Sequence, residues 1–291
     1  MSGGAPQSQP SQPQRADSTD NLRRPGALRV PQGDGEVILG GISIGDASLL
    51  LGAGVLAGMV GSAGGIASLI SYPVLLAVGL PAKPANVADT VAFVASLPGS
   101  ALGSRPELKG QARRVLRFAP LAMAASAAGA VLLLITPAGV FGRIVPFLVA
   151  FAALALLAAP RVSAWLKERP GRSGGVWPQC GLLAVWVFDG YWGVGAGVMA
   201  LAVLAMAVET NLARANALKN MLLGVADVTC SIVFIVCGPV RWAAVVPLAA
   251  GVLAGSRAGP SLTRRVPADV LRIAVALVGL GLAVYLWVSP R

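Results

Sequence analysis

Residues 147–159 read FLVAFAALALLAA, an unbroken apolar run, and residues 131–135 read VLLLI. A strand of a membrane β-barrel alternates apolar and polar residues, and neither of these runs alternates. Inside a bilayer every backbone N–H and C=O needs an internal partner, which only helices and closed barrels supply. Both runs are therefore predicted to lie in membrane-spanning helices.

Similar apolar runs fill most of the chain. Its 291 residues are 56% hydrophobic and 12% charged, with a mean hydropathy of +0.74, whereas soluble domains are about 45–50% apolar and about 25% charged. Since one crossing takes about 20 residues, we expect an all-α polytopic integral membrane protein with about 8–10 transmembrane or re-entrant helices. The expected segments are residues 47–62, 64–80, 86–104, 115–136, 140–159, 179–194, 196–210, 215–237, 240–259 and 268–288.

Composition divides the chain into four parts. Residues 1–45 are rich in Pro, Ser, Gln and Gly and have too little apolar surface to offset the entropy of ordering, so we expect a disordered polar tail. A first membrane repeat is expected over 46–160, a basic connecting loop over 161–178 and a second membrane repeat over 179–291. The tail lacks the order of charged, apolar and small residues that marks a removed signal peptide.

The net charge of +11 comes from Lys and Arg dispersed between the apolar runs. This pattern is typical of cytoplasmic loops of membrane proteins and differs from the clusters that bind nucleic acid, so no nucleic-acid partner is expected. Two topologies stay open. If all ten segments cross, the Arg-rich loops after the third, fifth and ninth share the cytoplasmic face and the halves are inverted; if the short segments are re-entrant, Arg257, Arg264 and Arg265 break that agreement.

Several kinds of enzyme are excluded by residues that the chain lacks. It has no histidine, which rules out an imidazole base or a His-ligated metal. Its three cysteines, Cys180, Cys230 and Cys237, have no metal-type spacing and are interpreted as structural. No phosphate-binding loop of the ATPase type is present. We therefore expect no catalytic residue, no metal site, no cofactor and no enzymatic activity.

Two glycine-rich stretches resemble each other. Residues 58–65 (GMVGSAGG) and 190–197 (GYWGVGAG) share glycines at their first, fourth and eighth positions. Further along, residues 85–90 (ANVADT) parallel residues 215–220 (ANALKN). The glycines alone could serve only close helix packing. Because both pairs agree in register, we predict two homologous halves with glycine-broken helices, a plan of secondary transporters whose site lies at the repeat interface.

Polar residues near these stretches suggest an anion site. Backbone N–H groups at helix N-termini attract anions, and glycine lets the backbone approach them closely. We expect Lys219 to attract the anion, and Asp89 or Asp227 to balance its charge or carry a proton, since charges inside membrane helices are functional by default. The predicted substrate-binding residues are Gly61, Gly64, Gly65, Asn86, Thr90, Gly193, Gly195, Gly197, Asn216, Lys219 and Asn220, and the predicted coupling or charge-balancing residues are Asp89 and Asp227.

Other interpretations of the charged residues stay open. Asp89 and Lys219 could instead lie near helix ends and extend to the membrane interface. Asp227 could pair with Lys219, two turns earlier, instead of titrating. Asp189 and Arg214 flank the two short segments of the second half and are interpreted as ordinary boundary residues.

A family likeness rests on two stretches: GMVGSAGGIASLISYPVLLAVGLPAKPANVADT at 58–90 and FDGYWGVGAGVMALAVLAMAVETNLARANALKNMLLGVADV at 188–228. Over residues 47–288 the chain resembles the sulfite exporter TauE/SafE family of membrane permeases. The resemblance implies a transporter of sulfite, sulfonates, sulfoacetate or related anions. The first half departs from the commoner family pattern at Ser62, Ala63 and Asp89.

The expected function is that of a secondary transporter, a permease or exporter, for sulfite, a sulfonate or another organosulfur or organic anion. It is expected as a multi-pass protein in the bacterial inner or plasma membrane, in contact with lipid. A homo-oligomer, the coupling ion and the direction of transport are left open. The alternatives are an accessory or structural membrane subunit without transport activity, and a membrane-embedded enzyme, for which the chain offers no nucleophile and base pair.

Overall fold

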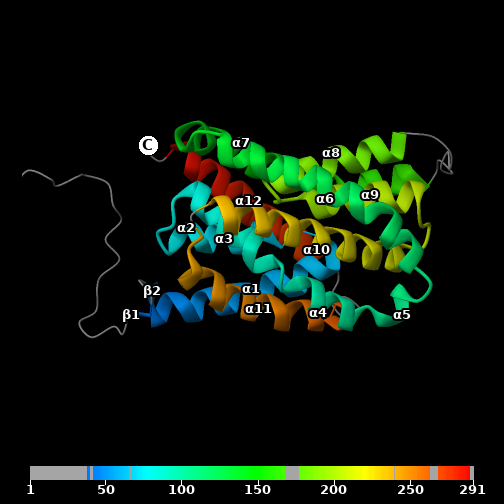
Figure 1. Cartoon of the computed structure of the whole chain (residues 1–291), viewed down its shortest axis with the longest axis horizontal. Coiled ribbons are helices and arrows are strands. Elements are labelled where there is room, and N and C mark those ends of the chain that lie inside the picture. Colours follow the sequence, from blue (N-terminus) through cyan, green and yellow to red (C-terminus); the bar gives the residue numbers. More distant parts are fainter. Residues whose placement is uncertain are drawn as a thin grey trace, which may run out of the picture. The chain divides into compact units, whose positions relative to one another are not determined.

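Helices make up nearly all of the chain that the structure, a computed structural model, describes (Figure 1). Most of the predicted tail lies outside the described residues. Its end forms a short antiparallel pair, β1 (Ile38–Leu39) with β2 (Ile42–Ser43), and the first helix follows directly. The described residues are 38–39, 42–65, 67–167, 177–238, 240–262 and 268–288.

The first helix is bounded by sequence signals at both ends. Ser43 Oγ accepts a hydrogen bond from the Asp46 N–H at 3.0 Å, and Gly65, at φ +76°, ends the helix in the left-handed conformation that glycine adopts without strain. The helices of the first half are α1 (Ile44–Gly64), α2 (Ser68–Ala77), α3 (Ala82–Phe93), α4 (Ser96–Gly103), α5 (Arg105–Leu108), α6 (Ala112–Ile135) and α7 (Ala138–Lys167).

The predicted segment 86–104 is divided into two helices, α3 and α4. Pro98 has no N–H to donate to the Val94 carbonyl one turn earlier, and that carbonyl accepts from Leu97 at 3.2 Å instead. The chain therefore turns between the two helices, where a single straight segment was expected.

The second half follows the predicted segments closely. Asn211 caps the helix that carries most of the predicted polar residues, accepting from the Arg214 N–H at 3.1 Å. The helix α7 continues past residue 159 to Lys167, so part of the predicted loop 161–178 is helical, and residues 168–176 lie outside the description. The helices of this half are α8 (Trp177–Tyr191), α9 (Ala196–Ala207), α10 (Leu212–Cys237), α11 (Trp242–Leu262) and α12 (Ala268–Val288).

The expected all-α polytopic membrane fold is confirmed. Among the described residues, five helices are long and apolar enough to cross a membrane. By contrast, α2 and α9 have 10 and 12 residues, and at about 1.5 Å per residue such helices are too short to cross a hydrocarbon core of about 30 Å. The five long spans are Ile44–Ser62, Ala112–Ile135, Ala138–Ala158, Leu212–Cys237 and Trp242–Gly259.

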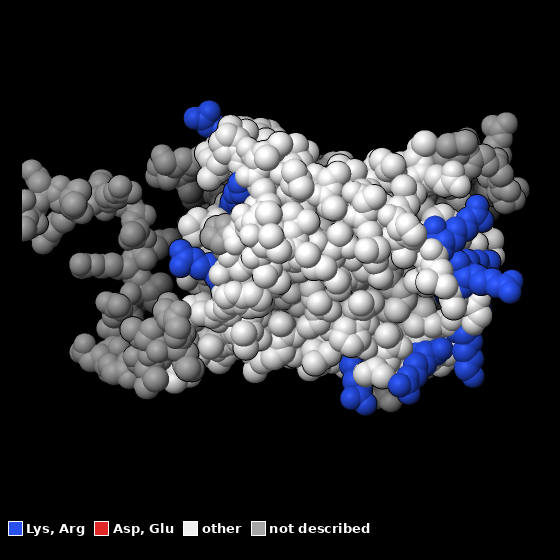
Figure 2. Space-filling view, in the orientation of Figure 1, with Lys and Arg blue, Asp and Glu red and all other residues white. Residues whose placement is uncertain are grey.

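The outer surface of the bundle is apolar between its two ends. Leu116, Ile135, Phe147 and Val236 are each more than half exposed, as expected of side chains that face lipid. Figure 2 shows a broad belt on this face without Lys, Arg, Asp or Glu, with basic side chains gathered mainly at the end where Figure 1 places α5.

Close packing between the halves depends on glycine. A Cβ on Gly54 of α1 would lie 2.3 Å from the Leu248 carbonyl oxygen of α11, and one on Gly255 of α11 would lie 2.1 Å from the Val55 carbonyl oxygen of α1. Any side chain there would push the two backbones apart, as in other membrane helix pairs joined through small residues. The helices α1 and α11 thus form the most extensive contact of the bundle.

The helices α6 and α8 pack in the same manner. A Cβ on Gly129 of α6 would lie 2.1 Å from the Val187 carbonyl oxygen, and one on Gly190 of α8 would lie 2.0 Å from the Ser126 carbonyl oxygen. In each case the first helix of one half packs against the fourth expected segment of the other half. This reciprocal packing accords with the predicted duplication, which itself stays a prediction.

The basic end of the bundle is expected to face the cytoplasm, because short loops rich in Lys and Arg are retained there. We expect a membrane-impermeant thiol reagent on intact cells to label Arg241→Cys, near the opposite end, and to leave Lys109→Cys unlabelled. Both would be made in a chain whose native cysteines are replaced by alanine. Labelling of Lys109→Cys before the cells are opened would reverse the assigned orientation. The basic residues near α5 are Arg105, Lys109, Arg113, Arg114 and Arg117.

Candidate functional site

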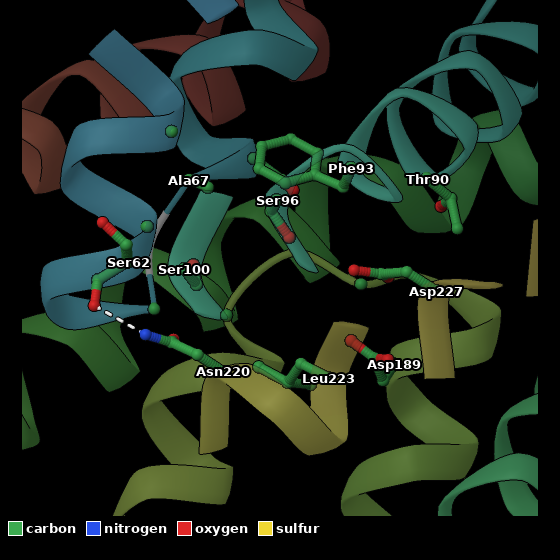
Figure 3. Close-up of a pocket in the computed structure, with 17 residues that line it drawn as sticks. Ser62, Ala67, Thr90, Phe93, Ser96, Ser100, Asp189, Asn220, Leu223 and Asp227 are labelled. Carbon is green, nitrogen blue, oxygen red and sulfur yellow. Dashed lines mark hydrogen bonds between the residues drawn. The ribbon is translucent and has the colours of Figure 1, made fainter. Parts of the chain in front are cut away.

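A small cavity lies where the two glycine-rich stretches meet (Figure 3). The space open to the centres of water molecules is about 70 Å³, and since one water needs about 10–15 Å³ on this measure, the cavity has room for several waters. Backbone groups and short polar side chains form the polar part of its lining. The lining residues are Gly58, Gly61, Ser62, Gly65, Ala67, Ser68, Thr90, Phe93, Ser96, Ser100, Asp189, Gly193, Gly195, Gly197, Asn220, Leu223 and Asp227.

The backbones of the two stretches touch beside this cavity. A Cβ on Gly197 would lie 2.6 Å from Gly65 Cα, and one on Gly65 would lie 2.6 Å from the Gly197 carbonyl carbon. Gly65, Gly193 and Gly195 also have positive φ angles of 76°, 75° and 88°, which side chains other than glycine adopt only at a cost. Glycine is therefore required here both by the close approach and by the backbone conformation.

Two short helices begin at the cavity wall, one from each half. Ala67 and Ser68 open α2, Gly195 and Gly197 open α9, and all four residues line the cavity. Neither helix start has a hydrogen bond from a capping side chain. The first N–H groups of a helix lack intrahelical partners and carry a partial positive charge, so both helix starts are suited to a negatively charged group.

Most of the predicted site residues fall into two groups. Eight of them line the cavity, and four lie outside its described lining. The surroundings of Gly64 lie outside the part that the structure describes. Those that line it are Gly61, Gly65, Thr90, Gly193, Gly195, Gly197, Asn220 and Asp227. Those outside the described lining are Asn86, Asp89, Asn216 and Lys219.

Three side chains of α10 bind the end of α1. Asn216 Nδ2 and Asn220 Nδ2 both donate to the Ser62 carbonyl oxygen, at 2.8 Å and 3.0 Å, and Lys219 Nζ donates to the Gly61 carbonyl oxygen at 3.4 Å (the Asn220 bond is dashed in Figure 3). The last carbonyls of a helix lack the usual partner four residues on; the Gly61 carbonyl oxygen also accepts from the Gly65 N–H at 2.8 Å, whereas the bonds to the Ser62 carbonyl oxygen come from α10. Asn216 and Lys219 therefore stabilise the break in α1, where direct contact with the substrate was expected.

The first half supplies a similar contact in return. Asn86 Nδ2 of α3 donates to the Tyr191 carbonyl oxygen at the end of α8, at 3.3 Å, and Thr90 Oγ1 donates to the Asn86 carbonyl oxygen at 3.1 Å. Each glycine break is thus bound by an asparagine from the other half. The paired asparagines were expected at the site, but these bonds between halves were not.

Burial rules out one alternative for the charged residues. Lys219 is 0% exposed and Asp89 is 3% exposed, so neither side chain extends to the membrane interface. The described residues also include no ion pair between Lys219 and Asp227, although that pairing was a possible alternative to titration of Asp227. One oxygen of Asp89, Oδ1, is buried without a hydrogen-bond partner.

Asp189 was wrongly interpreted as a boundary residue. It lies inside α8, is 6% exposed and lines the cavity beside Asp227. The signal was present in the sequence, because a carboxylate within the apolar run VWVFDGYW is functional by default in a membrane helix. Ser96 and Ser100 of α4, which also line the cavity, carried no comparable signal.

A polar network joins the halves near α5. Glu209 accepts hydrogen bonds from Arg114, and from Arg214 Nε at 3.1 Å, while a second nitrogen of Arg214 donates to the Lys109 carbonyl oxygen at 3.3 Å. Partial burial opposes ionisation of Glu209, but hydrogen bonds from the Asn211 N–H and the two guanidinium groups hold its pKa below the ordinary value. Arg214 lies in the first turn of α10, as expected of a boundary residue.

A buried aromatic cluster lies against the second glycine stretch. Trp192 is 1% exposed and packs edge-on against Tyr72, with ring centroids 5.0 Å apart, and at a tilt against Phe141 at 5.7 Å. These side chains belong to the large hydrophobic core and not to the cavity lining. The cluster fixes the position of the turn between α8 and α9.

Comparison with known proteins identifies the family. Residues 50–286 match the family model described as "Sulfite exporter TauE/SafE". The chain belongs to this family. Membership makes this TauE/SafE protein a multi-pass membrane transporter, which is not a class of enzyme.

Curated relatives agree with this assignment. The TauE/SafE protein is 27% identical over 230 residues to the "Probable membrane transporter protein YfcA" of Escherichia coli strain K12, covering 77% of this chain and 83% of that protein. The protein of the same name from Escherichia coli O157:H7 matches to the same extent. No solved structure matches the chain.

Proposed function

We propose that this TauE/SafE protein carries a small oxyanion, sulfite, a sulfonate or a related organosulfur or organic anion, through the cavity between the two glycine-rich stretches. The family description names a sulfite exporter, and the cavity contains groups suited to such a substrate. An oxyanion that leaves water must exchange its hydration shell for fixed donors, because unpaired charge in a membrane interior is costly.

The proposal rests chiefly on the meeting, at one cavity, of two helix starts that no side chain caps. The first residues of α2 and α9 line it, and glycine allows their backbones to approach a ligand. The hydroxyl groups of Ser96 and Ser100 and the amide of Asn220 line the same cavity. Together these groups offer hydrogen-bond donors from both halves.

The cavity also has the position expected of an alternating-access site. It lies between α1 and α2 of the first half and α8 to α10 of the second, and movement of one half against the other would expose it to each side in turn. The contacts between halves near α5, through Glu209, would have to open when that end admits substrate.

The test is flux in proteoliposomes of the purified full chain. We expect saturable exchange of labelled sulfite, ethanesulfonate or sulfoacetate for the same unlabelled anion, above the rate in protein-free vesicles. Acetate and a neutral sugar serve as controls for selectivity. If none of the anions exchanges faster than in protein-free vesicles, the proposed substrate class is wrong.

A further inference from the structure

The described lining of the cavity includes two carboxylates and no basic side chain. Asp189 of α8 and Asp227 of α10 both line it, and Figure 3 shows their carboxylates turned toward the same space. No Lys or Arg is among the lining residues that the structure describes. Lys219, which is buried outside the described lining, donates to the Gly61 carbonyl oxygen instead.

The surroundings of Asp189 favour a bound cation. Its side chain is almost wholly enclosed, at 6% exposed, and its Oδ2 has no hydrogen-bond partner. A buried carboxylate without a partner is costly when ionised, and a second carboxylate nearby adds repulsion. An anion entering the same cavity would add to that repulsion, so the substrate and two ionised carboxylates are poorly compatible.

We propose that Asp189 and Asp227 together hold one proton, which enters and leaves the cavity with the anion. This inference rests on the proposed function and deepens it by naming the coupling ion and its binding pair. In each cycle one of the two carboxylates takes up a proton from the side on which the anion enters, which forms an O–H bond. When the cavity opens to the other side, that bond breaks and the proton leaves with the anion. The carboxylate pair then has its starting charge again, so the protein undergoes no net change.

A proton suits this pair better than a metal ion does. Among the residues that the structure describes, no group of three or more His, Cys, Asp or Glu side chains could hold a metal ion. Two adjacent carboxylates, by contrast, readily share a single proton. The pair also explains why Oδ2 of Asp189 is buried without a hydrogen-bond partner, which a purely structural role leaves unexplained.

The surroundings leave the pair as the main titrating unit of the cavity. The other titratable groups that act on it are Asp89 of α3 and Cys230 on α10. The neighbouring helices α4 and α9 carry no charged side chain, and α6 carries its arginines only in its first turns. Asp89 lies outside the cavity lining, beside Ser68 and Ser71, and therefore does not face the substrate.

The test separates anion exchange from proton-driven accumulation. Proteoliposomes are loaded at alkaline pH and diluted into more acidic medium, with the membrane potential clamped at zero by potassium and valinomycin. The probe is ethanesulfonate, which stays ionised throughout, or sulfite if only sulfite exchanges, and protein-free vesicles correct for passive permeation. With one proton per anion, wild type should accumulate the probe about tenfold for a pH difference of about one unit.

Neutral variants of the pair should exchange without accumulating. In Asp189→Asn and Asp227→Asn, we expect counterflow exchange to continue while the accumulation ratio falls to that of equilibrium. The matched control is Asp46→Asn, an acid in the first turn of α1 outside the cavity, which should accumulate like wild type. A merely structural role would reduce exchange and accumulation together.

Several outcomes would overturn the inference. Accumulation by Asp189→Asn equal to that of wild type would do so, as would wild-type accumulation driven by a sodium gradient and not by a pH gradient. If neither variant can be purified folded, the external pH is measured during uptake by the wild type. Uptake of the probe must make the outer medium more alkaline, and an unchanged external pH would overturn the inference. If wild type exchanges no anion, the proposed function fails and the inference fails with it; exchange without accumulation rejects the inference alone.

Discussion

Replacing Gly197 by alanine is expected to reduce anion flux to less than about a tenth of wild type, since overpacking of about 1–3 kcal/mol falls on the site itself. The added Cβ would lie 2.6 Å from Gly65 Cα and 2.7 Å from the Gly65 carbonyl oxygen. Both contacts are with backbone, so no side chain can rotate away to relieve them. The two glycine stretches would have to separate, which would move the start of α9 away from the cavity.

Gly65→Ala should have an effect at least as large. Its Cβ would meet the Gly197 carbonyl carbon at 2.6 Å, and its φ of +76° adds the cost of a left-handed conformation. The matched control is Gly52→Ala, in the same helix α1, where nothing lies within 4 Å of the added Cβ. The measurements are flux in proteoliposomes and the thermal midpoint in detergent. Wild-type flux in Gly197→Ala would contradict the close approach described here.

The second large effect is expected at Lys219. Replacing it by methionine keeps the buried aliphatic volume but removes the amino group and its bond to the Gly61 carbonyl oxygen. An intramolecular hydrogen bond contributes about 0.5–1.5 kcal/mol, so flux should fall by up to about tenfold. Lys219→Ala should fall further, because it also leaves a cavity.

Two controls separate charge from packing at this position. Lys109→Ala, an exposed residue near α5, should leave flux unchanged, and Lys219→Arg should restore part of the flux lost in Lys219→Met. Flux in Lys219→Met equal to that of wild type would remove the charge from the mechanism. The thermal midpoint of each variant shows whether the protein is folded.

The sequence predicted the helices well because lipid leaves few alternatives to helix for long apolar runs. All ten expected segments coincide with helices, and the errors lie at their boundaries. Pro98 divides one segment, whereas α7 continues through Pro160 to Lys167. Proline in a helix interior usually ends or kinks the helix, so local sequence signals do not account for where α7 ends.

The site was only partly predictable, because its assembly depends on contacts between the halves. The glycine stretches and Asn220 were expected and line the cavity, but no sequence pattern indicates that Asn216 would donate to Ser62 or Asn86 to Tyr191. Lys219 was expected to face the anion, yet its bond to α1 lies in the wall behind it. Such long-range partners are fixed only by the tertiary packing.

Asp189 was missed for a different reason. It was interpreted as an ordinary boundary residue between two short segments, whereas in the structure it lies in the last turn of α8 with its carboxylate buried. A stricter use of hydropathy around Asp189 would have assigned it to the membrane interior, where a carboxylate needs a functional explanation.

The reciprocal glycine contacts bear on how the chain is assembled during synthesis. The helix α1 is inserted early, but its close partner α11 is translated only when most of the protein has been made. Until then the glycine face of α1 has no permanent neighbour and must rest against lipid or the insertion machinery. Neither half can complete its own packing alone, so the final fold forms only when the last helices have been made. Truncation of the C-terminal region should therefore leave the early helices without their native partners.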